Sequence, residues 1–146
     1  METIPSKQFG EKIRIMERKL GLLEKYYTDS FIFSSITLTQ CHTLVEIGKA
    51  KSIALKDLSM RLNLDISTTS RNVDALVKKN YVQRVTSELD RRSVNIFLTD
   101  NGKELFCDIE NKMDNFFEQI FSRIPEQDKA NVLHSLDLIL DAFNKK

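Results

Sequence analysis

Apolar side chains recur every three or four positions near the start of the chain, a spacing that predicts an amphipathic helix from about Ser6 to Asp29. Charged side chains fill the opposite face of this helix. The apolar stripe consists of Phe9, Ile13, Met16, Leu20, Leu23 and Tyr27. A second helix is expected to begin at the N-cap Thr39 and to end at Gly48.

The middle of the chain changes to short helices separated by turn residues. Three leucines at helical spacing predict a short helix over Leu55–Leu62, and a second helix is expected over about Ile66–Lys79. Between them, Asn63 suits a left-handed backbone, and Asp65 is placed to cap the second helix. Asn80 suits the left-handed position that ends it. The inner face of the second helix consists of Thr69, Val73, Leu76 and Val77.

Two runs with alternating or β-branched residues follow, Val82–Thr86 and Val94–Leu98. This pattern predicts two β-strands. The seven residues between them contain Asp90, Arg91 and Arg92, so the strands are expected to form a hairpin with a charged tip. Short helix, tight turn, second helix and charged hairpin together predict a winged helix-turn-helix.

The last third of the chain is helical again. Thr99 is expected to cap a helix of about 24 residues, roughly 36 Å long. The stripe of this helix consists of Leu105, Ile109, Met113, Phe116, Ile120 and Ile124. Pro125 is expected in the first turn of a final amphipathic helix. The long helices carry more apolar surface than one protomer can cover, which favours a homodimer.

The composition narrows the class of protein. With 146 residues, 41% of them hydrophobic and 29% charged, the chain is long enough for a packed core and is not intrinsically disordered. Four glycines leave no material for a phosphate-binding loop, and two cysteines are too few for a disulfide scaffold. We expect a cytoplasmic protein without membrane contact, because the chain has no signal peptide and no apolar run of about 18 residues.

The expected fold class is therefore mainly α (α+β), in which dimerisation helices flank a winged helix-turn-helix. Residues 39–103 would form the winged lobe, with the helix-turn-helix over about 55–79 and the wing over about 82–98. Residues 1–38 and 104–146 would supply the dimerisation helices. The net charge of +1 is an average: residues 51–103 carry ten basic and six acidic side chains, and residues 104–146 carry five and nine.

The second of the two short helices has the chemistry of a helix that reads DNA. Small polar residues at its N-terminal end can approach phosphates and base edges, Arg suits guanine and Asn suits adenine. The arginines of the hairpin tip can enter a minor groove, with Asp90 holding one of them in position. The predicted DNA contacts are Ser67, Thr68, Thr69, Ser70, Arg71, Asn72, Lys78, Arg84, Asp90, Arg91 and Arg92.

Over essentially its whole length, the chain resembles the MarR family of bacterial transcriptional regulators. The segment from Leu58 to Leu76 is similar to the helix-turn-helix of that family. Asp90-Arg91-Arg92-Ser93, followed by Leu98-Thr99-Asp100-Asn101-Gly102, resembles its wing motif. The chain departs from the usual pattern at three positions, where Ser59 replaces a common Ala and Asn63 and Asn80 replace common glycines.

The resemblance implies a homodimer, formed by the N- and C-terminal helices, that binds a near-palindromic operator. We expect it to regulate transcription as a repressor. It implies that Arg92 enters the minor groove while Asp90 braces the wing. It also implies that a small ligand or an oxidant weakens DNA binding. Tyr26, Tyr27 and His42 are the candidates for lining an effector site.

An alternative interpretation uses Cys41. A thiol near the start of a helix can respond to oxidants, and with His42 and Glu46 it could bind a metal ion. A buried structural cysteine is the simpler expectation, and we assign no metal site and no cofactor. Cys107, inside the long helix, is expected to pack at an interface. An enzyme that uses Cys41 and His42 is disfavoured, because helix neighbours about 100° apart do not face each other.

Overall fold

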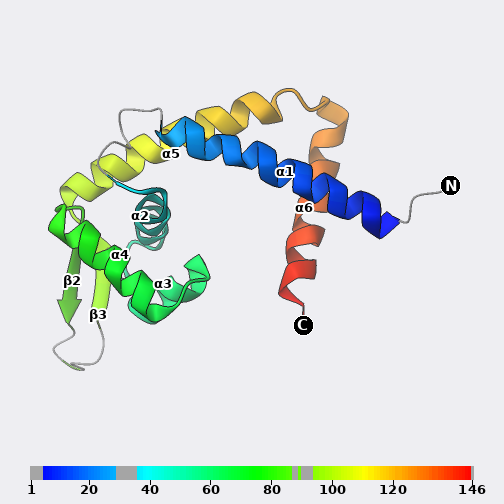
Figure 1. Ribbon diagram of the computed structural model, residues 1–146. Helices are drawn as coiled ribbons and strands as arrows, with labels where there is room; N and C mark the ends of the chain where they lie inside the picture. Colours follow the sequence, from blue (N-terminus) through cyan, green and yellow to red (C-terminus); the bar gives the residue numbers. More distant parts are fainter. Residues whose placement is uncertain (1–4, 29–35, 87–88, 90–93, 146) are drawn as a thin grey trace. The chain divides into compact units, whose positions relative to one another are not determined.

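The computed structural model describes residues 5–28, 36–86, 89 and 94–145, and for residues 22–28 it describes the backbone alone. Most of these residues are helical (Figure 1). The helices are α1 (Pro5–Thr28), α2 (Leu38–Ala50), α3 (Leu55–Leu62), α4 (Ile66–Lys78), α5 (Asp100–Phe121), a short 3-10 helix (Glu126–Asp128) and α6 (Lys129–Asn144). The strands are β1 (Ile53–Ala54), β2 (Val82–Thr86) and β3 (Val94–Leu98). No described helix is long and apolar enough to cross a membrane.

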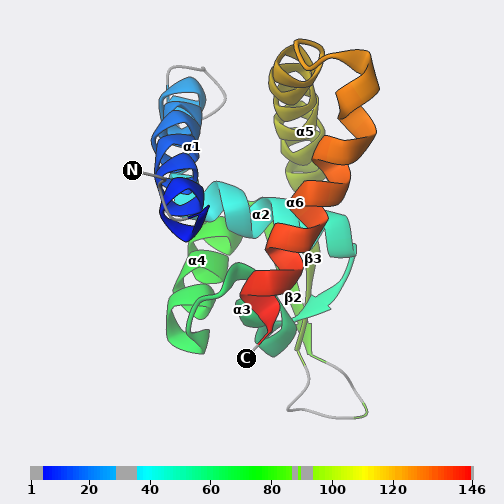
Figure 2. The same ribbon diagram turned by 90° about the vertical axis from the view of Figure 1, so that its right-hand side faces the viewer.

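The chain divides into two compact units, one up to Ile109 and one from Glu110. In the first unit, α2, α3 and α4 contact one another and a small sheet contacts all three helices (Figure 2). The strand order is β1-β3-β2, and both pairs are antiparallel. Fully buried side chains from each layer meet between the helices and the sheet and form one core. They include Leu44, Ile47, Leu58, Val73, Leu76 and Ile96.

The predicted elements of this unit are confirmed with small changes. The strands of the hairpin and the helix over Leu55–Leu62 have the expected bounds, and mainly α structure with a small antiparallel sheet is the expected fold class. The strand β1 was not predicted. It has only two residues, Ile53 and Ala54, and it exists because it pairs with β3. A segment this short has no periodic signal of its own.

Both predicted ends of α2 were wrong. Thr37, not Thr39, is the N-cap: its hydroxyl accepts a hydrogen bond from the Gln40 amide, and the Gln40 side chain accepts one from the Thr37 amide. This reciprocal pair satisfies two amides that the helix leaves free. Gly48 does not end the helix, which continues to Ala50. A Cβ on Gly48 would collide with the Phe106 ring, so close packing explains this glycine.

The start of α5 is tied to the end of α4. The Thr99 hydroxyl donates to the Asn80 carbonyl (2.7 Å) and accepts a hydrogen bond from the Gly102 amide (3.0 Å). The Thr99 amide donates to the Tyr81 carbonyl (3.0 Å). Asn80 has the left-handed backbone expected from the sequence (φ 65°). Thr99 is therefore the predicted cap of α5 and also a connection to α4.

The second unit contains the rest of α5, the 3-10 helix and α6. Pro125 precedes the 3-10 helix rather than standing in the first turn of α6, which corrects the sequence prediction. The Lys129 ammonium lies 2.8 Å from Glu126 and 5.2 Å from the centroid of the Phe121 ring. α6 buries no residue. Its exposed apolar side chains are Leu133, Leu136, Leu138, Leu140 and Phe143.

Gly102 is a strict requirement of the α4–α5 connection, since a Cβ there would overlap the Tyr81 carbonyl. We expect Gly102→Ala to lower the free energy of unfolding by about 1–3 kcal/mol, the usual cost of overpacking. Gly10→Ala is the matched control, because no atom lies within 4 Å of its added Cβ. Urea unfolding measures both variants, and equal midpoints for the two would contradict this account.

Candidate nucleic-acid interface

The turn between α3 and α4 depends on one left-handed residue. Asn63 has φ 53° and ψ 43°, as its place in the sequence predicts. Its amide donates to the Met60 carbonyl (3.2 Å), and the Leu64 amide donates to the Ser59 carbonyl (3.1 Å). Asn tolerates this backbone better than other residues with a Cβ. The chain can therefore reverse tightly and begin α4 at Ile66, directly after the N-cap Asp65.

Asp65 organises the first turn of α4. Its carboxylate accepts a hydrogen bond from the Thr68 amide (2.7 Å). Hydrogen bonds from the Thr68 hydroxyl and amide, and the positive charge of Arg71, hold the pKa of Asp65 below its ordinary value of 3.8. The Arg71 guanidinium donates to the Thr68 hydroxyl (3.3 Å). The predicted cap is confirmed, and it belongs to a chain of three polar side chains on the helix surface.

The two faces of α4 differ in exposure. Ser67, Arg71 and Lys78 are exposed, and Thr68 is half-buried. The opposite face is fully buried at Thr69, Val73 and Leu76. Val77, predicted on the inner face, is 39% exposed. The exposed face is therefore rich in hydrogen-bond donors and positive charge.

Two of the predicted contact residues are not free on that face. Thr69 is fully buried, and its hydroxyl donates to the Asp65 carbonyl (2.9 Å), so its inclusion among the DNA contacts is not supported. Asn72 is half-buried, and its side-chain nitrogen is buried without a hydrogen-bond partner among the described residues. The burial of Thr69 confirms its predicted place on the inner face of α4. The sequence pattern did not separate Asn72 from the exposed polar residues beside it, because its type suits either environment.

Arg84 connects the wing to α4. From β2, its guanidinium lies 3.1 Å from the Asp74 carboxylate and donates to the hydroxyl and the carbonyl of Ser70 (3.2 Å each). Ser70 and Asp74 are one helical turn apart, so a single guanidinium reaches both. Sequence reasoning placed Arg84 and Ser70 among the DNA contacts and missed Asp74. The spacing of Ser70 and Asp74 on one helix face was the available signal.

Three predicted residues of the wing, Asp90, Arg91 and Arg92, lie outside the described residues. The side chains of Tyr26 and Tyr27 do so as well, although their backbone belongs to α1. The third candidate for an effector site, His42, is an exposed residue of α2.

Cys41 has the burial expected of a structural cysteine. Its side chain is fully buried, whereas the neighbouring His42 is exposed, so the two do not share a surface. The Glu46 carboxylate, the third residue of the metal-site alternative, lies 4.0 Å from the Arg61 guanidinium. Among the described residues, no three His, Cys, Asp or Glu side chains are grouped closely enough to hold a metal ion. Cys107, which was expected to pack at an interface, is exposed in the isolated chain.

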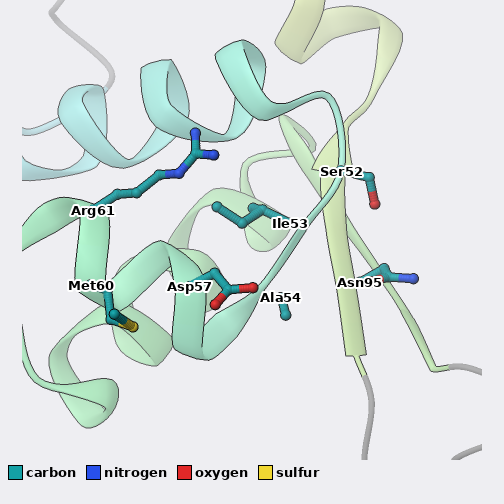
Figure 3. A pocket seen from close by; sticks show the side chains of 7 residues that line it. All are labelled: Ser52, Ile53, Ala54, Asp57, Met60, Arg61 and Asn95. Carbon is teal, nitrogen blue, oxygen red and sulfur yellow. The ribbon is translucent and has the colours of Figure 1, made fainter.

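A hollow of about 540 Å³ lies between α3 and the sheet. Figure 3 shows that the Arg61 side chain extends from α3 toward a neighbouring helix, consistent with its pairing with Glu46 of α2. Asp57, Met60 and Asn95 also line the hollow. It carries charges of both signs and no aromatic wall, so its chemistry selects no ligand class.

The Asp65 cap generates a dependence of stability on pH. Because its pKa is lowered in the folded state, the carboxylate stabilises the fold above the unfolded pKa and stops doing so as the pH falls through the folded pKa. We expect Asp65→Asn to reduce the free energy of unfolding at pH 7 and to converge with the wild type in acid. Urea unfolding across this range measures the difference.

An NMR titration of the Asp65 carboxyl group provides the direct check. The midpoint should lie below 3.8 and should rise in Thr68→Val, because this variant removes the hydroxyl that contributes most to the shift. A midpoint at or above 3.8 in the wild type would contradict the proposed cause.

Comparisons with known proteins agree with this architecture. A sequence model of the MarR family matches residues 36–94. The chain is 32% identical over 124 residues to the HTH-type transcriptional regulator SarZ of Staphylococcus epidermidis, covering 83% of this chain and 81% of SarZ. FabT of Streptococcus pneumoniae, solved in complex with DNA, is 25% identical with a TM-score of 0.84, covering 95% of this chain and 97% of FabT.

A MarR transcriptional regulator of Methanosarcina mazei Go1 is also similar, with 26% identity and a TM-score of 0.76 over 93% of this chain and 96% of that one. These relatives are named as transcriptional regulators and not as enzymes. The winged helix-turn-helix predicted from the sequence is thereby confirmed. The chain belongs to the MarR family of transcriptional regulators.

Proposed function

We propose that this protein is a sequence-specific DNA-binding repressor that acts as a homodimer on a palindromic operator. The observation that carries the proposal is the exposed polar face of α4, with Ser67, Arg71 and Lys78 opposite a fully buried face. A helix presented in this way beside a β-hairpin fits a major groove, with the hairpin at the adjacent backbone. FabT, which has the same fold, was solved with DNA.

In this proposal, different residues of α4 contact the bases and the phosphates of the DNA. Arg71 contacts base edges, because a guanidinium can donate two hydrogen bonds to guanine. Ser67, Thr68 and Lys78 contact phosphates and set the register of the helix. Arg91 and Arg92 enter the minor groove and Asp90 braces them, as the family resemblance implies. Thr69 acts from the buried face of α4, and Arg84 acts by positioning α4 through Ser70 and Asp74.

The proposed dimer covers apolar side chains that the isolated chain exposes. On α1 they are Phe9, Ile15, Met16 and Leu20, each 44–47% exposed. On α6, Leu140 and Phe143 are 60% and 72% exposed. Stripes of this kind on long helices are typical of helix–helix interfaces. A two-fold dimer would place its recognition helices about one turn of DNA, ~34–36 Å, apart.

The proposal also includes an effector, a small ligand or an oxidant, that lowers DNA affinity. The alternative, sensing through Cys41 and His42, is less favoured because Cys41 is fully buried. A regulator of this kind works where the DNA is, and we expect it in the cytoplasm.

Substitutions on α4 test the DNA interface. With DNA from upstream of its own gene, Arg71→Ala should weaken binding by ten-fold or more and reduce discrimination against unrelated DNA, since a bidentate base contact is worth about 1–3 kcal/mol. Lys78→Gln should weaken binding to both DNAs and lower the slope of log K against log salt by about one unit per contact. Fluorescence anisotropy measures both effects.

Arg84 and Asp74 provide the matched comparison. If Arg84 positions α4, then Arg84→Ala and Asp74→Asn should both weaken binding while the salt slope stays unchanged. If Arg84 instead contacts DNA, Asp74→Asn should strengthen binding, because it removes a repulsive charge. The interface proposal fails if neither Arg71→Ala nor Lys78→Gln changes affinity.

The dimer is tested on α6. Leu133 and Leu140 are two turns apart and both are more than half exposed. We expect the double variant Leu133→Asp/Leu140→Asp to sediment as a monomer and the wild type to sediment with twice the chain mass, because two buried carboxylates would be desolvated. Ser135→Asp is the control on an exposed polar position of the same helix. A dimeric double variant would show that α6 is not in the interface.

A further inference from the structure

The first turn of α4 contains a hydrogen-bonded chain of side chains that ends at Arg71. The Asp65 carboxylate accepts a hydrogen bond from the Thr68 amide (2.7 Å), and the Thr68 hydroxyl accepts one from the Arg71 guanidinium (3.3 Å). Each residue of the chain is three positions from the next, so all three side chains lie along one side of the helix. The chain therefore connects the N-cap of α4 to a cation on its exposed face.

The Thr68 side chain is itself held in place. A β-branched side chain has few allowed χ1 angles in a helix, and Thr68 is half-buried. Its hydroxyl bonds to the Asp65 carboxylate, which is the largest cause of the lowered pKa of that group. The hydroxyl hydrogen is thus committed to Asp65, and the hydroxyl oxygen is available as an acceptor for Arg71.

This arrangement restricts a side chain that is ordinarily free. The Asp65 carboxylate also attracts the Arg71 guanidinium by charge. An exposed arginine samples many rotamers and loses this freedom when it binds a partner. A guanidinium that already rests on Thr68 loses less, because part of its ordering precedes binding.

The bond to Thr68 leaves Arg71 able to read a base. A guanidinium holds its N–H donors in one plane, and two of its edges each present a pair of them. The bond to Thr68 uses a single Nη2 hydrogen, so one complete pair remains on the other edge. Such a pair matches the O6 and N7 acceptors of guanine in the major groove.

We propose that Thr68 is a positioning residue for DNA recognition, which holds the Arg71 guanidinium in the orientation in which it bonds to a guanine. This inference rests on the proposed function, in which Arg71 is the residue that contacts base edges. The role is separate from a phosphate contact of Thr68. A lost phosphate contact weakens binding to every DNA alike, whereas a less ordered Arg71 lowers the preference for the operator.

The first measurement needs no DNA. NMR relaxation of the Arg71 Nε–H group gives its order parameter in the free protein. We expect this order parameter to fall in Thr68→Val, which removes the hydroxyl at nearly unchanged size, and to be retained in Thr68→Ser. Thr39→Val, which removes an exposed hydroxyl of α2, is the matched control and should leave it unchanged. Urea unfolding checks that each variant is folded.

The second measurement locates the guanine. In DNA from upstream of the protein's own gene, guanines are replaced one at a time by 7-deazaguanine, which lacks the N7 acceptor. Fluorescence anisotropy gives the affinity for each DNA. The guanine that Arg71 contacts is the one whose replacement weakens binding of the wild type but not of Arg71→Ala.

The ratio of the affinities for the unmodified DNA and for this modified DNA tests Thr68. Thr68→Val should lower the ratio about two- to ten-fold, the cost of ordering one long side chain. Thr68→Ser should keep the ratio of the wild type. Added to Arg71→Ala, Thr68→Val should leave the ratio unchanged, because the two residues act together. A phosphate contact does not affect the ratio, since both DNAs share it.

Three results would overturn this inference alone: an Arg71 order parameter that does not fall in Thr68→Val, a ratio that Thr68→Val leaves at the wild-type value, and a ratio that Thr68→Val lowers equally in the Arg71→Ala background. A set of DNAs in which no guanine separates the wild type from Arg71→Ala would exclude guanine as the base. If Arg71→Ala and Lys78→Gln both bind the operator as tightly as the wild type, the proposed function fails and this inference fails with it.

Discussion

The contact between the start of α5 and the end of α4 is the constraint on which the first unit depends. Thr99 bonds to the carbonyls of Asn80 and Tyr81, and Gly102 lies directly against the Tyr81 carbonyl. The strand β3 ends at Leu98, immediately before this contact. The hairpin, α4 and α5 therefore meet at one short segment, and none of the three can shift without breaking these hydrogen bonds or moving Gly102 away from the Tyr81 carbonyl.

This connection explains how α4 and the hairpin are held in a fixed orientation relative to each other. At the C-terminal end of α4, the hydrogen bonds of Thr99 to Asn80 and Tyr81 fix the positions at which the hairpin begins and ends. Along the helix, Arg84 adds a second tie by bonding to Ser70 and Asp74. Two separated attachments determine an orientation, whereas one would permit rotation. The exposed face of α4 is thus presented at a defined angle to the hairpin, as groove recognition requires.

The basic side chains and the exposed apolar side chains lie in different segments of the chain. The basic side chains concentrate in residues 51–103, where α4 and the hairpin lie, and residues 104–146 are acidic. Four exposed leucines and Phe143 lie on α6, and a further stripe of exposed apolar side chains lies on α1. A near-neutral chain can in this way keep its basic side chains apart from its acidic ones, and negative charges repel DNA only where they lie close to it.

Much of this architecture was predictable from the sequence, because its signals are local. Helical periodicity located α3 and α4, alternation located β2 and β3, and single residues such as Asn63, Asp65 and Thr99 marked turns and caps through the hydrogen bonds that their own side chains can make. The family resemblance rests on the same local motifs, and the wing arginines and the proposed effector remain predictions.

Tertiary packing decided what local signals could not. It gave α2 its cap at Thr37, paired the two residues of β1 with β3, half-buried Asn72 and directed Arg84 toward α4. The sequence determined which segments are helix, strand or turn and which polar groups are available. Only the folded structure decided which of those groups face solvent, because burial depends on neighbours that the chain supplies from a distance.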